Sequence, residues 1–254
     1  MGGALAHGWL KSGKVGLTLV DRDTNILQRF QSIYADAVRE GRLRTLTDSR
    51  SATENADMIV LVVKPWLMPD VITEIRDKVD LKRQTVVSDA AGFGTDKLEK
   101  AFGREGQYFY VIPNIAAEYG SSMSFVAAHP AATDDSKRQV RELYALCGEV
   151  LEVRENQVAA GMMMASCGIA YVMRMIRAMQ LAGTEMGFYP NEAQKIAQQT
   201  MLGAVRLLGE SGLHPEAAID KVTTPGGVTI KGLNEMDMAG FNAAVIRGLK
   251  AGLK

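Results

Sequence analysis

The residues with the clearest chemical potential form one short stretch near the carboxyl end, residues 222–229 (VTTPGGVT). Two adjacent glycines can turn successive backbone N–H groups in one direction, which makes a concave site for an anion such as a carboxylate. The hydroxyl groups of Thr224 and Thr229 would add hydrogen bonds. The alternative interpretation is a corner between two helices in which a threonine acts as a cap. We favour a carboxylate-binding loop.

A second group of candidate residues follows three apolar runs in the first half of the chain. These residues are Val63-Lys64-Pro65, Ala91-Gly92 and Pro113-Asn114. Because the carboxyl ends of parallel strands line the ligand crevice of an open sheet, the three loops are expected to share one site. Gly92 permits close approach of a ligand to the backbone, and a buried Lys64 could hold a cofactor phosphate or ribose. Each motif alone also fits a plain turn.

The amino terminus reads as a short helix over residues 1–10, followed by an apolar run at 15–20 that ends in Asp21-Arg22. This order is typical of the second half of a dinucleotide-binding βαβ unit, in which the helix amino end binds the pyrophosphate. Gly2 would be the third glycine of G-x-G-x-x-G, so we expect the chain to start inside that fingerprint, without its first strand and first two glycines. An ordinary glycine-containing helix is the alternative.

The end of that run is also where an adenosine ribose would be recognised. An acid there suits a free 2′-hydroxyl group, whereas an arginine suits a 2′-phosphate. Because Asp21 and Arg22 are both present, the residues leave the choice between NADPH and NADH open.

The elements that must position these residues change in character along the chain. Short apolar runs alternate with helical segments such as 23–39 and 66–79, which predicts a mostly parallel sheet covered on both faces. The predicted strands are 15–20, 43–46, 58–63, 85–88, 108–112, 123–127 and 149–153. From about residue 155 the pattern predicts helices at 157–187, 191–210 and 240–252. We therefore expect an α/β domain over residues 1–154 and an all-α domain over residues 155–254.

Composition excludes several classes of protein. The 254 residues carry 29 Lys+Arg and 29 Asp+Glu, so no net charge draws the chain to nucleic acid or an anionic membrane. We find no apolar run of about 18 residues and no signal peptide, so we expect no membrane span and a cytoplasmic protein. The two cysteines and three histidines match no disulfide or metal-site spacing, and we expect no metal.

These motifs, taken in order, resemble the pyrroline-5-carboxylate reductase family over nearly the whole chain. The ordered set is Gly2 with Ala4-Leu5, Val63-Lys64-Pro65, Ala91-Gly92, Pro113-Asn114, Ala170-Tyr171, Ala182-Gly183 with Gly187, Gln199-Thr200 with Leu202-Gly203-Ala204, and Thr224-Pro225-Gly226-Gly227 with Thr229. The resemblance implies a Rossmann domain followed by a helical dimerisation domain. It also implies reduction of 1-pyrroline-5-carboxylate to L-proline by NADPH or NADH, in a homodimer that can assemble into a decamer.

The resemblance also implies roles for individual residues. The loop would bind the substrate carboxylate, with Thr229 close to the imine nitrogen as the catalytic residue and the partner subunit helping to complete the site. The expected substrate-binding residues are Thr224, Gly226, Gly227, Val228 and Thr229. The expected cofactor-binding residues, with NADPH as the first choice and NADH possible, are Gly2, Arg22, Val63, Lys64, Pro65, Ala91, Gly92 and Asn114.

Several positions depart from the family pattern. The family's Met-Pro-Asn-Thr-Pro is here Ile112-Pro113-Asn114-Ile115-Ala116, and its Asp-Ala-x-Thr-Ala and Gly-Ser-Gly-Pro-Ala-Tyr are here residues 159–163 and 166–171. The substitutions that bear on the crevice are Ile115, Ala116, Ala159, Met162 and Ile169. They keep two alternatives open: a reductase of another cyclic imine, and a dimeric paralogue without activity. A β-hydroxyacid dehydrogenase is disfavoured because residues 157–187 contain no lysine.

Overall fold

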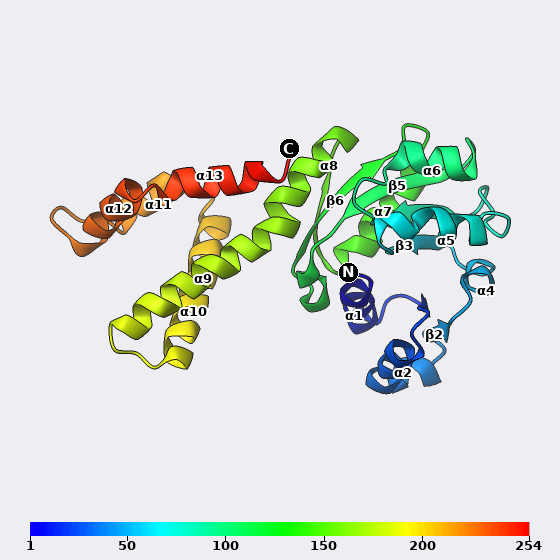
Figure 1. Cartoon of the computed structure of the whole chain (residues 1–254), viewed down its shortest axis with the longest axis horizontal. Helices are drawn as coiled ribbons and strands as arrows, with labels where there is room; N and C mark the ends of the chain where they lie inside the picture. Colours follow the sequence, from blue (N-terminus) through cyan, green and yellow to red (C-terminus); the bar gives the residue numbers. More distant parts are fainter. Residues whose placement is uncertain (254) are drawn as a thin grey trace. The chain divides into compact units, whose positions relative to one another are not determined.

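The computed structural model describes residues 1–253, and its contacts divide the chain into two units, Met1–Ser166 and Cys167–Lys254 (Figure 1). The first unit alternates helices with strands. Its elements in order are α1 (Gly2–Ser12), β1 (Leu17–Val20), α2 (Thr24–Ile33), α3 (Ala35–Arg39), β2 (Leu43–Leu46), α4 (Ser49–Thr53), β3 (Met58–Leu61), η1 (Pro65–Leu67), α5 (Met68–Ile75), β4 (Thr85–Ser88), α6 (Thr95–Phe102), β5 (Gln107–Ile112), η2 (Ile115–Tyr119), β6 (Ser122–Ala128), α7 (Asp134–Ala145), β7 (Gly148–Glu152) and α8 (Glu155–Met162).

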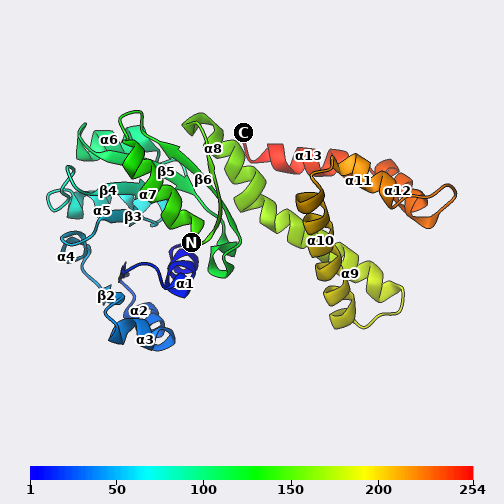
Figure 2. The same ribbon diagram turned by 180° about the vertical axis from the view of Figure 1, so that it is seen from behind.

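The strands form two separate sheets. β1 and β2 are parallel partners, and a five-stranded sheet has the order β3-β4-β5-β6-β7. Figure 2 labels β3, β4, β5 and β6 of the larger sheet and β2 of the smaller one. All pairs in the larger sheet are parallel except β5 with β6, which run antiparallel. The predicted strands and the mostly parallel α/β fold are therefore confirmed. The single expected sheet is divided between β1 and β3, so each of these strands has one edge without a strand partner among residues 1–253.

The core lies on both faces of the larger sheet because β5 alternates its side chains. Phe109 and Val111 pack with Leu5 of α1 and Tyr144 of α7 on one face. On the other face, Tyr108 packs with side chains from β3, β4, α5 and α6. Strand β4 is buried along its whole length, as a strand with helices on both faces must be. The carboxyl ends of β3, β4 and β5 are thus held in place by side chains packed on both faces of the sheet.

Two helices that the sequence predicted as continuous are interrupted. The predicted helix at 23–39 breaks at Tyr34, whose backbone (φ −111°, ψ 42°) leaves the helical region between α2 and α3. The hydroxyl of Tyr34 lies 2.8 Å from Nδ1 of His7, so this break is fixed by a contact with α1. The predicted helix at 157–187 is interrupted by η3 (Met163–Cys167), a π-helical turn.

Helix α8 belongs to the first unit, because it packs on β5 and β6 and buries Val158 against Tyr110, Ile112 and Ala127. The boundary expected between residues 154 and 155 therefore coincides with the start of α8, whereas the contacts divide the chain after Ser166. The turn of η3 is held within the first unit by the Ser166 hydroxyl, which donates to the carbonyl oxygen of Pro113 at 2.6 Å.

The second unit is helical, with α9 (Gly168–Glu185), α10 (Pro190–Ser211), α11 (Pro215–Lys221), α12 (Val228–Met238) and α13 (Phe241–Ala251). Helices α9 and α10 form a close hairpin, because a Cβ at Gly183 would lie 2.9 Å from Cβ of Ala193. Tyr171 donates to the carbonyl oxygen of Gly248 at 3.3 Å and so ties α9 to α13. Many large apolar side chains of this unit are exposed, among them Met173, Leu181, Met186, Val205 and Ile246.

One finding differs from the expectation that no stretch is apolar enough for a membrane span. The helical stretch Glu155–Glu185 is long and apolar enough to cross a bilayer by length and composition, with 17% of the tested window buried. A helix that packs against another copy of the chain passes the same test, so this property is weak evidence for a membrane segment.

Candidate functional site

The amino end of α1 is the first element of the candidate cofactor site. Gly2 lies beside the residue that follows β3, because a Cβ at this position would be 3.6 Å from Cβ of Val62. Among residues 1–253 no side chain caps this helix, so the first-turn N–H groups remain available to an acceptor. The helix amino end therefore combines free donors with the positive end of the helix dipole, which together suit a phosphate.

The two candidate ribose-recognition residues have different environments. Oδ1 of Asp21 accepts the backbone N–H of Asp23 at 2.9 Å, so its carboxylate helps to form the turn that precedes α2. The side chain of Arg22 is 81% exposed, and its Nη2 lies 3.9 Å from Oε2 of Glu74 on α5. Arg22 is thus the freer of the two groups, with one carboxylate as its neighbour.

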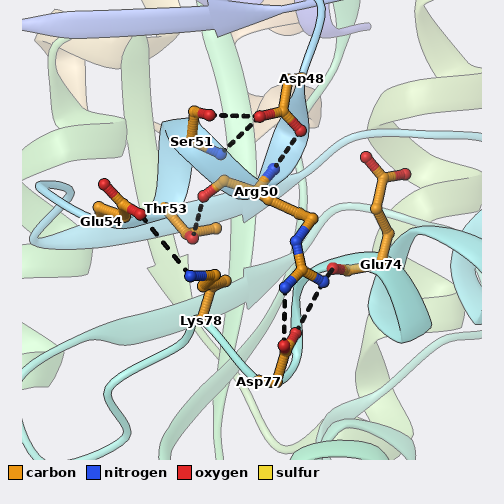
Figure 3. Close-up of polar contacts among 8 residues, drawn as sticks. All are labelled: Asp48, Arg50, Ser51, Thr53, Glu54, Glu74, Asp77 and Lys78. Carbon is orange, nitrogen blue, oxygen red and sulfur yellow. Dashed lines mark hydrogen bonds and ion pairs between the residues drawn. The ribbon is translucent and has the colours of Figure 1, made fainter.

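The position of Glu74 depends on a polar network between α4 and α5 (Figure 3). Asp48 accepts the backbone N–H groups of Arg50 and Ser51, both at 3.1 Å, and so caps α4. The Arg50 guanidinium donates to the carboxylate of Asp77 at 3.0 and 2.7 Å and to the carbonyl oxygen of Glu74 at 2.8 Å. The hydrogen bond from Arg50 lowers the pKa of Asp77. The network fixes the last turn of α5, which carries the carboxylate beside Arg22.

The loop after β3 holds Val63, Lys64 and Pro65. Pro65 starts η1, and the residue before it is extended (ψ 143°) as a following proline requires. The side chain of Lys64 is exposed and lies 6.0 Å from the ring of Trp66. The expectation of a buried lysine was therefore wrong: Lys64 directly precedes the short helix η1, and its side chain is exposed. An exposed Lys64 still presents a cation at the carboxyl end of β3.

The loop after β4 is held by side chains from three elements. Gly92 adopts φ +74°, a conformation that favours glycine. Its N–H donates to the Tyr110 hydroxyl at 2.9 Å, and its carbonyl oxygen accepts from Nζ of Lys97 at 2.6 Å. Glu155 of α8 accepts the backbone N–H of Thr95 at the loop's end. Ala91 and Gly92 are exposed at the tip.

The loop after β5 places Asn114 differently. Asn114 is 7% exposed, and its Oδ1 accepts the backbone N–H of Ala116 at 3.0 Å, which caps η2. Its backbone N–H donates to the hydroxyl of Ser122. The side chain is therefore already engaged within the loop, whereas the neighbouring Ile115 is 53% exposed.

The candidate substrate loop joins α11 to α12 in the second unit, as expected. The N–H of Gly227 donates to the carbonyl oxygen of Thr224 at 2.9 Å, which closes a tight turn with Gly226 at φ +72°. A Cβ at Gly227 would lie 2.6 Å from Oγ1 of Thr224, so the turn requires glycine there. Thr223 donates to carbonyl oxygens at the end of α11.

Of the two glycine amides first expected to bind an anion, that of Gly227 is engaged by the carbonyl oxygen of Thr224. Gly227 caps α12 without a side-chain hydrogen bond, so the first-turn N–H groups of Val228 and Thr229 are the ones available to an anion. Val228 is 84% exposed, and Thr224 and Thr229 are also exposed. The turn brings the Thr224 hydroxyl next to the amino end of α12, which is a geometry suited to a carboxylate.

The comparisons with known proteins add a separate line of evidence. A pyrroline-5-carboxylate reductase from Synechocystis sp. is 31% identical over 210 residues, which cover 83% of this chain and 78% of the relative. The chain belongs to the pyrroline-5-carboxylate reductase family. Residues 155–254 match the family model described as pyrroline-5-carboxylate reductase dimerisation, and residues 1–92 match one described as NADP oxidoreductase coenzyme F420-dependent.

Two further similarities are to another curated relative and, at the level of the fold, to a solved structure. Pyrroline-5-carboxylate reductase 1 from Dictyostelium discoideum is 30% identical over 98% of this chain, which spans 46% of that longer relative. The crystal structure of Plasmodium falciparum pyrroline carboxylate reductase with NADP bound superposes with a TM-score of 0.85 at 23% identity, covering 98% of this chain and 90% of the other. The predicted two-part fold, an α/β unit followed by a helical dimerisation unit, is confirmed.

Proposed function

We propose that this chain catalyses the NADPH-dependent reduction of 1-pyrroline-5-carboxylate to L-proline. The observation that carries the proposal is membership of the pyrroline-5-carboxylate reductase family along both units. The two alternatives considered from the sequence, another cyclic imine and an inactive paralogue, are less favoured, because the matched relatives carry one and the same name.

The residues of the first unit fit a dinucleotide. The uncapped amino end of α1 at Gly2 suits the pyrophosphate, and the exposed tip at Ala91 and Gly92 offers a surface with no side chain larger than a methyl group. Lys64 adds a cation at the end of β3. We assign contacts with the cofactor to these residues and to Arg22, Val63, Pro65 and Asn114.

We infer a preference for NADPH over NADH. The reason is that a carboxylate oxygen of Asp21 accepts a hydrogen bond in the turn before α2, whereas the Arg22 side chain is exposed to solvent. An exposed guanidinium matches a 2′-phosphate, with which it can form charge-assisted hydrogen bonds. Comparison of kcat/KM for the two nucleotides tests this preference.

The loop of the second unit is our choice for the substrate carboxylate. Thr224 would donate its hydroxyl, Val228 and Thr229 their backbone N–H groups, and Gly226 and Gly227 allow the turn to form. The Thr229 hydroxyl is the group that we assign to the ring nitrogen of the imine. When bound, the cofactor supplies the hydride that the imine carbon accepts. The protonated imine is already an electrophile, so the protein mainly orients the ring and excludes water.

We propose a homodimer as the working assembly, formed by the helical unit, and a decamer as the larger assembly that the family resemblance implies. The exposed apolar side chains of α9 and α10 support self-association. Replacing the exposed Leu181 by glutamate is expected to convert dimers to monomers, and light scattering after size exclusion measures the molar mass. We also propose a cytoplasmic location, which the free thiols of Cys147 and Cys167 support and cell fractionation tests.

The activity itself is tested with the purified chain, NADPH and 1-pyrroline-5-carboxylate. The proposal expects loss of NADPH absorbance matched by an equal amount of L-proline. Binding of NADPH without oxidation by this substrate, but with oxidation by another cyclic imine, would support the alternative reductase. Absence of NADPH and NADH binding in calorimetric titration would support the inactive paralogue.

A further inference from the structure

The loop after β4 has an unusual support, which comes from a helix 60 residues further along the chain. Both carboxylate oxygens of Glu155, in the first turn of α8, accept the backbone N–H of Thr95, at 3.2 and 3.3 Å, and one also accepts the Thr95 hydroxyl. Thr95 is the first residue of α6, and Gly94 supplies no side chain to cap that helix. Glu155 therefore provides the cap from outside the helix, where a negative charge also meets the positive end of the dipole.

Gly94 makes room for this carboxylate. A Cβ at Gly94 would lie 1.7 Å from Oε1 of Glu155, so any other residue would displace the carboxylate from the amino end of α6. The backbone of Gly94 (φ −79°) is open to any residue, and the requirement is therefore for space. Thr95 itself is 2% exposed, which shields these hydrogen bonds from water.

The same loop is fixed at its tip. Tyr110 accepts the N–H of Gly92 and Lys97 donates to its carbonyl oxygen. The backbone N–H and the carbonyl oxygen of Gly92 are thus both occupied by protein groups. Lys97 lies on α6, whose start is held by Glu155. Movement of the start of α6 would carry Lys97 with it and release one of the two bonds that fix the tip.

We propose that Glu155 is a positioning residue for cofactor binding: from the first turn of α8 it caps α6 and so holds the Ala91–Gly92 tip in the form that the dinucleotide contacts. This inference rests on the proposed function, since it takes Ala91 and Gly92 as cofactor contacts. It adds that the helix leading into the dimerisation unit sets the shape of the cofactor loop.

The test compares Glu155→Ala with Glu155→Gln and with the control Glu152→Ala, whose exposed side chain lies on β7. Losing the charge-assisted bonds to Thr95 is expected to raise the Kd for NADPH about tenfold in Glu155→Ala. Glu155→Gln keeps one acceptor and is expected to change the Kd about threefold. Glu152→Ala is expected to keep the wild-type Kd, and all three variants are expected to keep the KM for the imine substrate.

Gly94→Ala is an independent variant that leaves Glu155 in place and displaces its carboxylate. It is expected to raise the Kd for NADPH as Glu155→Ala does, and the double variant is expected to be no weaker than either single variant. Hydrogen exchange of the Thr95 and Gly92 amides, measured without nucleotide, is expected to accelerate in both single variants. If Glu155→Ala does not fold, Gly94→Ala and Glu155→Gln carry the test.

Two results would overturn the inference. One is a lower melting temperature in Glu155→Ala and Gly94→Ala with an unchanged Kd for NADPH. This result would mean that Glu155 stabilises α6 and has no role in cofactor binding. The other is an equal fall in affinity for nucleotide and imine, which would indicate general damage. A wild-type chain that binds no nucleotide would instead contradict the proposed function, and the titration of the wild type distinguishes that failure from the other two.

Discussion

The hydroxyl of Tyr144 on α7 donates to Oδ1 of Asp89 at 2.6 Å, and both side chains are buried. Asp89 directly follows β4, and its Oδ2 has no hydrogen-bond partner among the described residues. Burial raises the pKa of Asp89 to about 8, against the lowering effect of the Tyr144 hydrogen bond and of the positive amino terminus. Burial, and to a smaller extent the proximity of Asp89, raises the pKa values of Tyr144 and Cys147. The raised pKa of Asp89 favours the protonated, neutral form of its carboxyl group in the folded chain.

This pair makes stability depend on pH in a direction opposite to that of a salt-bridged carboxylate. Above about pH 4 the unfolded chain loses the Asp89 proton, while the folded chain keeps it until about pH 8. Unfolding then releases a proton, so the free energy of unfolding falls by up to about 1.4 kcal/mol per pH unit across this interval. We expect Asp89→Asn to remove that slope. Denaturant unfolding of the wild type and of Asp89→Asn between pH 4 and 9 measures this slope. If the free energy of unfolding changes with pH equally in the two proteins, the prediction is contradicted.

Arg22 and Glu74 are expected to set the preference between nucleotides. Removing the guanidinium in Arg22→Ala should raise the KM for NADPH about tenfold and leave that for NADH unchanged, because the 2′-phosphate loses a charged partner. Glu74→Gln removes the carboxylate that lies 3.9 Å from Arg22 and should lower the KM for NADPH about two- to threefold. Steady-state kinetics with both nucleotides measures these effects. Arg39→Ala, on the exposed end of α3, is the control.

The turn before α12 can be tested through its glycines. In Gly227→Ala the new Cβ would meet Oγ1 of Thr224 at 2.6 Å and its carbonyl oxygen at 3.0 Å, so the turn must open. We expect the KM for the imine substrate to rise about tenfold or more. Gly232→Ala lies on the same helix with nothing within 4 Å of its Cβ, and it should keep the KM and stabilise α12 by about 1 kcal/mol. Equal KM values in the two variants would contradict a role for the turn.

Thr229 is the residue on which the catalytic assignment depends. If its hydroxyl forms a hydrogen bond with the ring nitrogen, Thr229→Val should lower kcat/KM. The fall should correspond to a loss of about 1–3 kcal/mol of transition-state stabilisation. Thr229→Ser should restore most of the activity because it returns the hydroxyl. Unchanged turnover in Thr229→Val would remove Thr229 from the mechanism.

The sequence predicted the strands well because each is a short apolar run of branched side chains, as in Met58–Leu61 and Thr85–Ser88. It also placed the turn at Gly226 and Gly227 between two helices. It did not predict Glu155 as the cap of α6 or the Tyr110–Gly92 bond, because these contacts join residues 60 and 18 positions apart and leave no local pattern. Lys64 was expected to be buried in the crevice at the strand ends, but its side chain is exposed.

The division of the sheet gives a last prediction, about the edges of β1 and β3. The N–H groups of Leu17 and Asp21 donate to the residues of β2 and their neighbours, and the carbonyl oxygens of Asp57 and Leu61 accept from the β4 side. Alternate residues of a parallel strand point to opposite sides, so the amides of Thr18, Val20, Met58 and Val60 face the open edges. We expect these four amides to exchange faster with deuterium than those of Leu19 and Ile59. Slow exchange at all four amides in the purified chain would contradict this expectation, because an open edge lacks the hydrogen-bonded neighbour that protects a paired strand.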